Sequence, residues 1–198
     1  MKALTLVTVL LCGIHQEHND SIHLTVDDIP NRPTIIYPVI PINGRQAIQE
    51  GKWIEKPYIF ICHDGPVSET RVRRATQYWE RLGYSFGPIS TLERGNEKCM
   101  TDDAVGGSIT IDIPSQTFQF GTHLGQTRTW RWTATNEIFK ARIEIIPAWG
   151  DSERILEHEI GHALGWMDMN SPGHIMHGVW SSGGHNSKGV RNENDERR

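Results

Sequence analysis

Two histidines and a glutamate stand at helical spacing in "HEIGH", residues 158–162 of the 198-residue chain. On an α-helix, residues four positions apart lie on one face, so His158 and His162 can direct an imidazole nitrogen towards a common point. Zinc binds such nitrogens at about 2.0–2.1 Å, and a catalytic zinc site combines three protein ligands with a water molecule. Glu159 could take a proton from that water as the water attacks a carbonyl. The pattern therefore predicts a catalytic base beside a zinc ion.

A glycine and an aspartate follow the two histidines. Gly165 is where a helix would end in a left-handed residue and turn back, because glycine adopts positive φ without strain. The turn allows residue 168 to approach the metal from the opposite side, and a carboxylate oxygen can bind zinc at about 2.0–2.2 Å. Asp168 is therefore the predicted third ligand. His174 and His177 on the following turn are the competing ligands, and in a plainer interpretation Asp168 only caps the turn.

This stretch resembles the pattern of the metzincin zinc endopeptidases, H-E-x-x-H-x-x-G-x-x-H followed by a methionine turn. Here the pattern is formed by His158, Glu159, His162, Gly165 and Asp168, with Met176 in "HIM" as the turn methionine. The chain departs from the commoner pattern at Asp168, where small bacterial members similar to snapalysin also carry aspartate. The resemblance implies a working site with Met176 as an apolar floor beneath the metal. It is specific over 151–177 and rests on element order over 57–150.

The resemblance also implies where a substrate would bind. The strand through "TRTWRW", residues 127–132, would be an antiparallel edge strand along which an extended peptide pairs by backbone hydrogen bonds. Thr127 and Thr129 on this strand are candidate substrate-binding residues. Val179 and Trp180 are the apolar candidates for a pocket wall beyond the metal.

Helices and strands around the motif follow from hydrophobic periodicity. A strand is predicted at 58–62, and a helix from Pro66 to Gly83 follows it, with four apolar residues facing a sheet and Arg71 outside that stripe: Val72, Ala75, Trp79 and Leu82. Further strands are predicted at 84–90, 108–113, 117–134, where there is room for one or two, and 141–146. Asp151 or Ser152 can cap the motif helix. We therefore expect an α+β fold with a mixed, mostly parallel five-stranded sheet, one antiparallel edge strand, the active-site helix and a backing helix.

Four segments are expected along the chain. Residues 1–14 suit a short signal peptide, which would place the protein outside the cell or in the periplasm; as an N-terminal β-strand, the same run would fit a cytoplasmic protein. The proline-rich residues 15–56 suit an N-terminal extension, linker or pro-segment. A catalytic domain is expected over 57–178, and a short flexible tail over 179–198.

Cysteines and lone histidines leave alternatives open. If residues 1–14 are removed, two cysteines remain, Cys62 and Cys99. They could form one disulfide, and two buried free thiols explain them equally well. His63, His123 and His185 stand apart from the motif, and lone histidines are more often surface or hydrogen-bonded residues than metal ligands.

Composition and charge narrow the function classes. The net charge of −4, with scattered lysines and arginines, gives no basic stripe for nucleic acid, and the short N-terminal apolar run predicts no stable membrane span. The leading hypothesis is a zinc endopeptidase acting on protein or peptide substrates, with a monomer as the default state. The alternatives are a zinc-stabilised binding or structural module without turnover, and another zincin in which a residue such as Glu193 supplies the third ligand.

Overall fold

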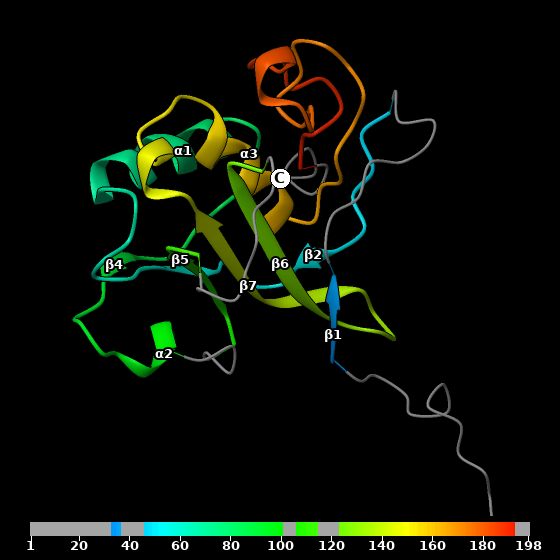
Figure 1. Cartoon of the computed structure of the whole chain (residues 1–198). Helices are drawn as coiled ribbons and strands as arrows, with labels where there is room; N and C mark the ends of the chain where they lie inside the picture. Colours follow the sequence, from blue (N-terminus) through cyan, green and yellow to red (C-terminus); the bar gives the residue numbers. More distant parts are fainter. Residues whose placement is uncertain (1–32, 37–45, 101–105, 115–122, 193–198) are drawn as a thin grey trace, which may run out of the picture. The chain divides into compact units, whose positions relative to one another are not determined.

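The computed structural model describes residues 33–36, 46–100, 106–114 and 123–192 of the chain. All of them belong to the second of two compact units, Asn31–Arg198. Within this unit the fold is mixed α and β, with a mostly parallel, curled sheet and α-helices on its faces (Figure 1). The predicted fold class is confirmed at this level.

The described strands form one sheet in the order β1-β6-β7-β5-β3-β4, and β2 pairs with β7 outside this path. Their bounds are β1 Pro33–Ile36, β2 Lys52–Trp53, β3 Tyr58–Ile61, β4 Ile89–Thr91, β5 Ser108–Asp112, β6 Gly125–Trp132 and β7 Glu137–Ile145. The pairings β3–β4, β3–β5, β5–β7 and β2–β7 are parallel. Strand β6 runs antiparallel to both β7 and β1.

The sheet differs from the predicted one in three respects. It has seven strands among the described residues rather than five, because β1 and β2 come from the proline-rich segment 15–56. Strand β6 is antiparallel as predicted, but β1 covers its outer edge from Thr129 to Trp132. The strand predicted at 84–90 is present, but its bounds are wrong, since β4 contains only Ile89–Thr91. Before it, Gly87 donates to the carbonyl of Pro57 and Pro88 accepts from Ile59, but Pro88 has no amide hydrogen with which to extend the ladder.

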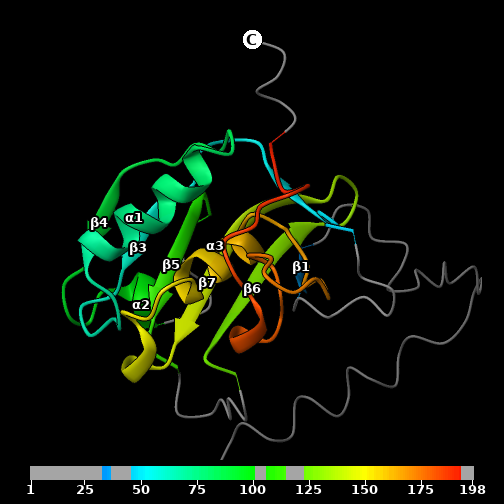
Figure 2. The same ribbon diagram turned by 90° about the horizontal axis from the view of Figure 1, so that it is seen from above.

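Helices α1 (Glu69–Glu80) and α3 (Ile155–Ala163) lie together on one face of the sheet, and α2 (Glu97–Met100) lies on the other (Figures 1 and 2). The side chain of Ser68 caps α1 by accepting a hydrogen bond of 3.2 Å from the backbone N–H of Arg71. Gly83, with φ of 90°, follows the helix as predicted. Helix α2 falls between the strands predicted at 84–90 and 108–113, where the sequence predicts no helix.

The hydrophobic core lies between the sheet and helices α1 and α3. Alternate strand residues face the helices and are almost fully buried: Ile59, Ile61, Ile109, Ile111, Ile143 and Ile145. The predicted α1 stripe meets them, with Val72, Ala75 and Trp79 fully buried and Leu82 partly buried. Arg71, predicted outside the stripe, is buried as well, because its guanidinium forms two hydrogen bonds to the Glu157 carboxylate of α3, of 2.7 and 2.6 Å.

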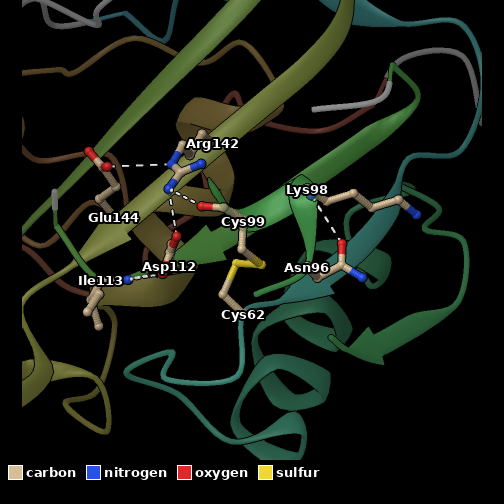
Figure 3. The surroundings of a disulfide bond; sticks show 8 residues. All are labelled: Cys62, Asn96, Lys98, Cys99, Asp112, Ile113, Arg142 and Glu144. Atoms are coloured by element: carbon tan, nitrogen blue, oxygen red, sulfur yellow. Dashed lines mark hydrogen bonds and ion pairs between the residues drawn. A yellow bond between two sulfur atoms is a disulfide. The ribbon is translucent and has the colours of Figure 1, made fainter. Parts of the chain in front are cut away.

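A disulfide joins Cys62, directly after β3, to Cys99 in α2 (Figure 3). Of the two alternatives for these cysteines, the structure has the disulfide. Beside it, Arg142 of β7 donates hydrogen bonds to the carbonyl of Cys99, at 3.2 Å, and to the carboxylate of Asp112, at 2.6 Å (Figure 3). The disulfide and this buried ion pair fix α2 to the sheet face opposite α1 and α3.

Two segments outside the predicted catalytic domain pack onto it. Residues 48–53 contact the end of α3 and the turn after it: the N–H of Glu50 donates to the carbonyl of Gly165 at 2.9 Å, and the Trp53 indole N–H donates to the carbonyl of Ala163 at 2.8 Å. In the expected flexible tail, Val190 is fully buried. The predicted ends of the signal segment, extension and domain stay predictions. No helix in the described parts of the chain has the length and apolar character needed to cross a membrane.

Candidate metal centre

Helix α3 carries the histidine motif and is buried on almost every side. It begins at Ile155, so the predicted caps Asp151 and Ser152 are wrong. The preceding residues instead form a 3-10 helix, η2 (Pro147–Trp149), and a turn that ends at Arg154, whose φ of 72° is left-handed. Arg71 donates to the carbonyl of Ser152 at 3.1 Å as well as to Glu157, so it binds both this turn and the first turn of the helix.

The imidazoles of His158 and His162 meet through their Nε2 atoms, which lie 3.0 Å apart. Each Nδ1 faces a backbone carbonyl: that of Ile175 at 2.8 Å for His158, and that of Trp166 at 2.7 Å for His162. A carbonyl can only accept, so each Nδ1 must carry the hydrogen, which leaves each neutral Nε2 with an unprotonated lone pair. Two lone pairs that face each other cannot form a hydrogen bond, but both can bind one cation.

Asp168 approaches the same point from the far side. Its Oδ1 lies 3.3 Å from the Nε2 atom of each histidine and is buried without a hydrogen-bond partner. Gly165 returns the chain as predicted: its φ is 94°, and a Cβ there would lie 2.1 Å from the carbonyl oxygen of Gly51. His158, His162 and Asp168 thus form a group that could hold a metal ion, with one ligand atom each, all within 4.8 Å of one another.

The pKa values of the cluster show how strongly its members interact. Burial lowers the pKa of His162, but Asp168 and Glu159 oppose this and the net pKa is raised. Burial raises the pKa of Asp168, but the two imidazoles more than offset this and hold its pKa far below the usual range. In metal-free protein, protonation of an imidazole is the way to satisfy Oδ1 of Asp168. A divalent cation would satisfy all three acceptors at once, so the donor set fits a metal such as zinc.

Glu159 points into the same site from the intervening helix position. Its Oε2 accepts a 2.6 Å hydrogen bond from the hydroxyl of Thr127 on β6, and both residues are buried. Gly125, also on β6, leaves room for the carboxylate: a Cβ there would lie 2.8 Å from Oε1 of Glu159. Strand β6 therefore positions the carboxylate of Glu159 in two ways: Thr127 donates a hydrogen bond to it, and the missing side chain of Gly125 lets it approach the strand.

Met176 lies beneath the motif helix in a tight turn. It is fully buried, and a Cβ at Gly161 would lie 2.3 Å from its sulfur, so Gly161 is what lets the methionine contact α3. His174 shapes this turn: its Nδ1 accepts from the N–H of Met176 at 3.0 Å, and its Nε2 lies 3.1 Å from the carbonyl of Lys188. Both nitrogens of His174 have backbone partners, so Asp168 and not His174 joins the histidine pair.

A cavity of about 620 Å³ opens beside the cluster. Val179 and Trp180 line it as predicted, and the ring of Trp180 also packs edge-on against Trp149, with centroids 5.6 Å apart. Among the other lining residues, Arg154 was not singled out by the sequence analysis, and His123 and His177 were considered only as possible metal ligands. None of the three belongs to the motif's fixed spacing, so the sequence carries no signal for a cavity-lining role of any of them.

The two threonines predicted to bind substrate lie in different surroundings. Thr127 is fully buried and its hydroxyl donates to Glu159, so its side chain positions the Glu159 carboxylate. Thr129 does not line the cavity, and its edge of β6 pairs with Ile36 of β1. The stretch His123–Thr127 borders the cavity directly.

The chain matches no family model, no curated protein and no solved structure. The metzincin resemblance thus remains a resemblance, carried by residues 151–177 and by element order.

Proposed function

We propose that this protein is a zinc-dependent endopeptidase of the metzincin type, with His158, His162 and Asp168 as the metal ligands and Glu159 as the general base. The observation that carries the proposal is the facing pair of Nε2 lone pairs, 3.0 Å apart, with the unpartnered Oδ1 of Asp168 at 3.3 Å from each. Three acceptors without a hydrogen among them repel one another unless a metal ion lies between them or one imidazole gains a proton.

The residues of the chain divide the chemistry between them. Bound zinc would act as a Lewis acid that makes a water molecule acidic near neutral pH. Glu159 accepts the proton as the water attacks the peptide carbonyl, and then delivers it to the leaving amine. Thr127 keeps the carboxylate of Glu159 turned towards the cavity through its 2.6 Å hydrogen bond. The carbonyls of Ile175 and Trp166 keep both imidazoles in the tautomer that ligation needs.

The part of β6 beside the cavity offers a place for an extended substrate. Strand β1 pairs with Thr129–Trp132, and no described strand pairs with the outer edge of Gly125–Thr127. An extended peptide could add here as a further strand, because unpaired backbone groups at a sheet edge accept such pairing. Its scissile bond would then pass the cavity that His123–Thr127 borders.

The compartment belongs to the same proposal. The Cys62–Cys99 disulfide suits an oxidising environment, because cytosolic thiols are normally kept reduced. We therefore propose that the protein works after export, in a secreted or periplasmic location.

A zinc-stabilised binding module without turnover is the competing function. A purely structural zinc site usually has four protein ligands, whereas the described residues supply three. The buried carboxylate of Glu159, held beside the cluster by Thr127, has no structural use in such a module.

A peptide-library cleavage assay tests the proposal. Purified protein should cleave extended peptides, lose this activity with a chelator and regain it with zinc. Exposed Glu153, a few residues before the motif, offers a control of equal charge change: Glu153→Gln should cleave normally. Stoichiometric zinc binding without any cleavage across the library would favour the non-catalytic module instead.

A further inference from the structure

Arg154 occupies a position that helix rules disfavour. It directly precedes α3, and its φ of 72° places a residue with a Cβ in the left-handed region. Its cationic side chain also lies at the positive end of the helix dipole, where anions are favoured. Neither local conformation nor helix electrostatics accounts for an arginine here, and such conflicts concentrate at functional sites.

The guanidinium of Arg154 is buried without a carboxylate of its own. The residue is only 5% exposed, and no carboxylate in the described parts of the chain lies within ion-pair distance of it. Glu157 acts on its charge, but the Glu157 carboxylate already binds Arg71 through two hydrogen bonds. Burial accordingly lowers the pKa of Arg154, and Glu157 only partly opposes the shift. A buried cation of this kind gains strongly from a new anion.

Arg154 belongs to the cavity beside the metal centre. It lines the cavity together with Val179 and Trp180, and its Nη2 donates to the carbonyl of Trp180. Gly183 packs directly on the guanidinium, since a Cβ there would overlap Nη1. A guanidinium has five N–H donors in a planar fork, so the bond to Trp180 uses only part of its capacity.

The other charged residues of the cavity face the metal cluster. Glu159 is bonded to Thr127, and Asp168 lies against His158 and His162. Arg154 is the single arginine or lysine among the described lining residues. A divalent cation bound by the cluster would offset the negative charge of Asp168. Arg154 would then supply the positive charge in the rest of the cavity lining.

We propose that Arg154 makes this cavity a subsite for a substrate carboxylate next to the scissile bond. This inference rests on the proposed endopeptidase function and assigns its specificity. Arginine suits the role because its fork binds a carboxylate through two parallel hydrogen bonds, which are stronger than those between neutral groups. Val179 and Trp180 are about half exposed and add apolar surface to the same cavity.

Equilibrium binding tests the subsite without turnover. Zinc-loaded Glu159→Gln protein is titrated with peptides in which a single Glu, or its isostere Gln, is moved through the positions around the cleavage site. At one position Glu should bind about tenfold to a hundredfold more tightly than Gln. Adding Arg154→Met should abolish that difference, and Arg154→Lys should retain part of it. Arg73→Gln, an exposed arginine paired with Glu69, controls for the change in net charge.

The two sources of a carboxylate are separated in the same titration. A peptide that ends at the preferred position is compared as free acid and as amide. A preference for internal Glu identifies a side-chain subsite, whereas a preference for the free acid alone identifies recognition of a chain end; either result, if lost in Arg154→Met, supports the proposal.

Two outcomes overturn the proposal. Equal binding of Glu and Gln peptides at every position removes the subsite, and this comparison needs no Arg154 variant, so it holds even if Arg154→Met fails to fold. A Glu preference that persists in Arg154→Met shows that the carboxylate binds the metal instead. In both cases the endopeptidase function would still be supported if the unmodified protein cleaves peptides in a chelator-sensitive way. If the protein binds Glu peptides more tightly but cleaves none, the endopeptidase function is wrong and the subsite stands.

Discussion

At His158 and His162, the hydrogen-bond partners decide what the imidazoles can do. The sequence predicts both ligands from their spacing, because two side chains four positions apart on a helix must converge. It cannot predict the Ile175 and Trp166 carbonyls that fix the tautomers, because backbone groups carry no sequence signal. Asp168 shows the same limit: the sequence leaves it in competition with His174, and only the folded turn separates them.

Asp168 and His174 make a matched pair of variants for metal binding. We predict that Asp168→Ala lowers zinc affinity by more than about a hundredfold. Mutating a residue that only hydrogen-bonds to a metal ligand already lowers metal affinity by up to about a hundredfold. His174→Ala should keep zinc binding within about tenfold but lower the free energy of unfolding by about 1–3 kcal/mol, because its backbone partners lose their bonds. Competition with a chromophoric chelator and denaturant unfolding measure the two effects. A reversed ranking of zinc affinity would make His174 the ligand.

Thr127 is expected to act through the base it contacts. Thr127→Val keeps the shape but removes the hydroxyl that bonds Glu159. We expect kcat to fall about tenfold to a hundredfold, the range of one hydrogen bond to a charged group, with KM nearly unchanged. Thr127→Ser should restore most of the rate. A rise in KM at constant kcat would instead return Thr127 to the substrate-binding role that the sequence predicts.

At the scale of elements, the sequence predicts the helices that carry periodic apolar residues and misses features that depend on distant partners. The α1 stripe and the Gly165 stop are correct, since both follow from local geometry. The predicted start of α3 is wrong because Arg71, over 80 positions away in sequence, donates a hydrogen bond to the turn before the helix. Strands β1 and β2 were missed because the prolines around them suggest unpaired chain, and strand pairing is a tertiary property.

The Arg71–Glu157 ion pair should stabilise the position of the motif helix. Arg71 and Glu157 are 3% and 9% exposed, so removal of one partner leaves a buried charge. Arg71→Met should therefore lower the free energy of unfolding by about 3–5 kcal/mol, and Arg71→Met with Glu157→Leu should recover most of that loss. Exposed Arg73→Met is the control. Denaturant melts of the four proteins give the values, and a loss below about 1 kcal/mol for Arg71→Met would show that the pair is not needed.

At the scale of the whole molecule, the charge state of the cluster links metal binding to pH. Asp168 raises the pKa of His162 above its ordinary 6.5, despite the opposing effect of burial. In metal-free protein the stability gained from this pair is present below pH 6.5 and lost as the pH rises through the raised pKa of His162. On the acid side it is lost as the pH falls through the lowered pKa of Asp168.

Protons should therefore compete with the metal at His162 from a pH above 6.5. We expect the apparent zinc dissociation constant to rise as the pH is lowered from 8 to 6, by up to about tenfold per unit for one proton. Asp168→Asn should bind zinc more weakly, and its proton competition should begin at lower pH. Zinc titrations at several pH values measure both; a dissociation constant independent of pH over this range would contradict the link.

Sequence and structure thus agree on the class of the fold and on the residues that the motif brings together, while the cavity and its arginine emerge only in three dimensions. His123 reaches the cavity from the chain before β6, Arg154 from the position before α3 and His177 from the chain after Met176. No periodicity connects these positions, so a single sequence offers no way to group them.

The role of Glu159 is the most direct test of the central claim. Zinc content and peptide cleavage are measured on the same preparations of unmodified protein, Glu159→Gln and the control Glu153→Gln. Glu159→Gln should retain one zinc per molecule and lose about a hundredfold to ten-thousandfold in cleavage rate, the usual contribution of a general base. Undiminished cleavage by Glu159→Gln with zinc still bound would contradict the account.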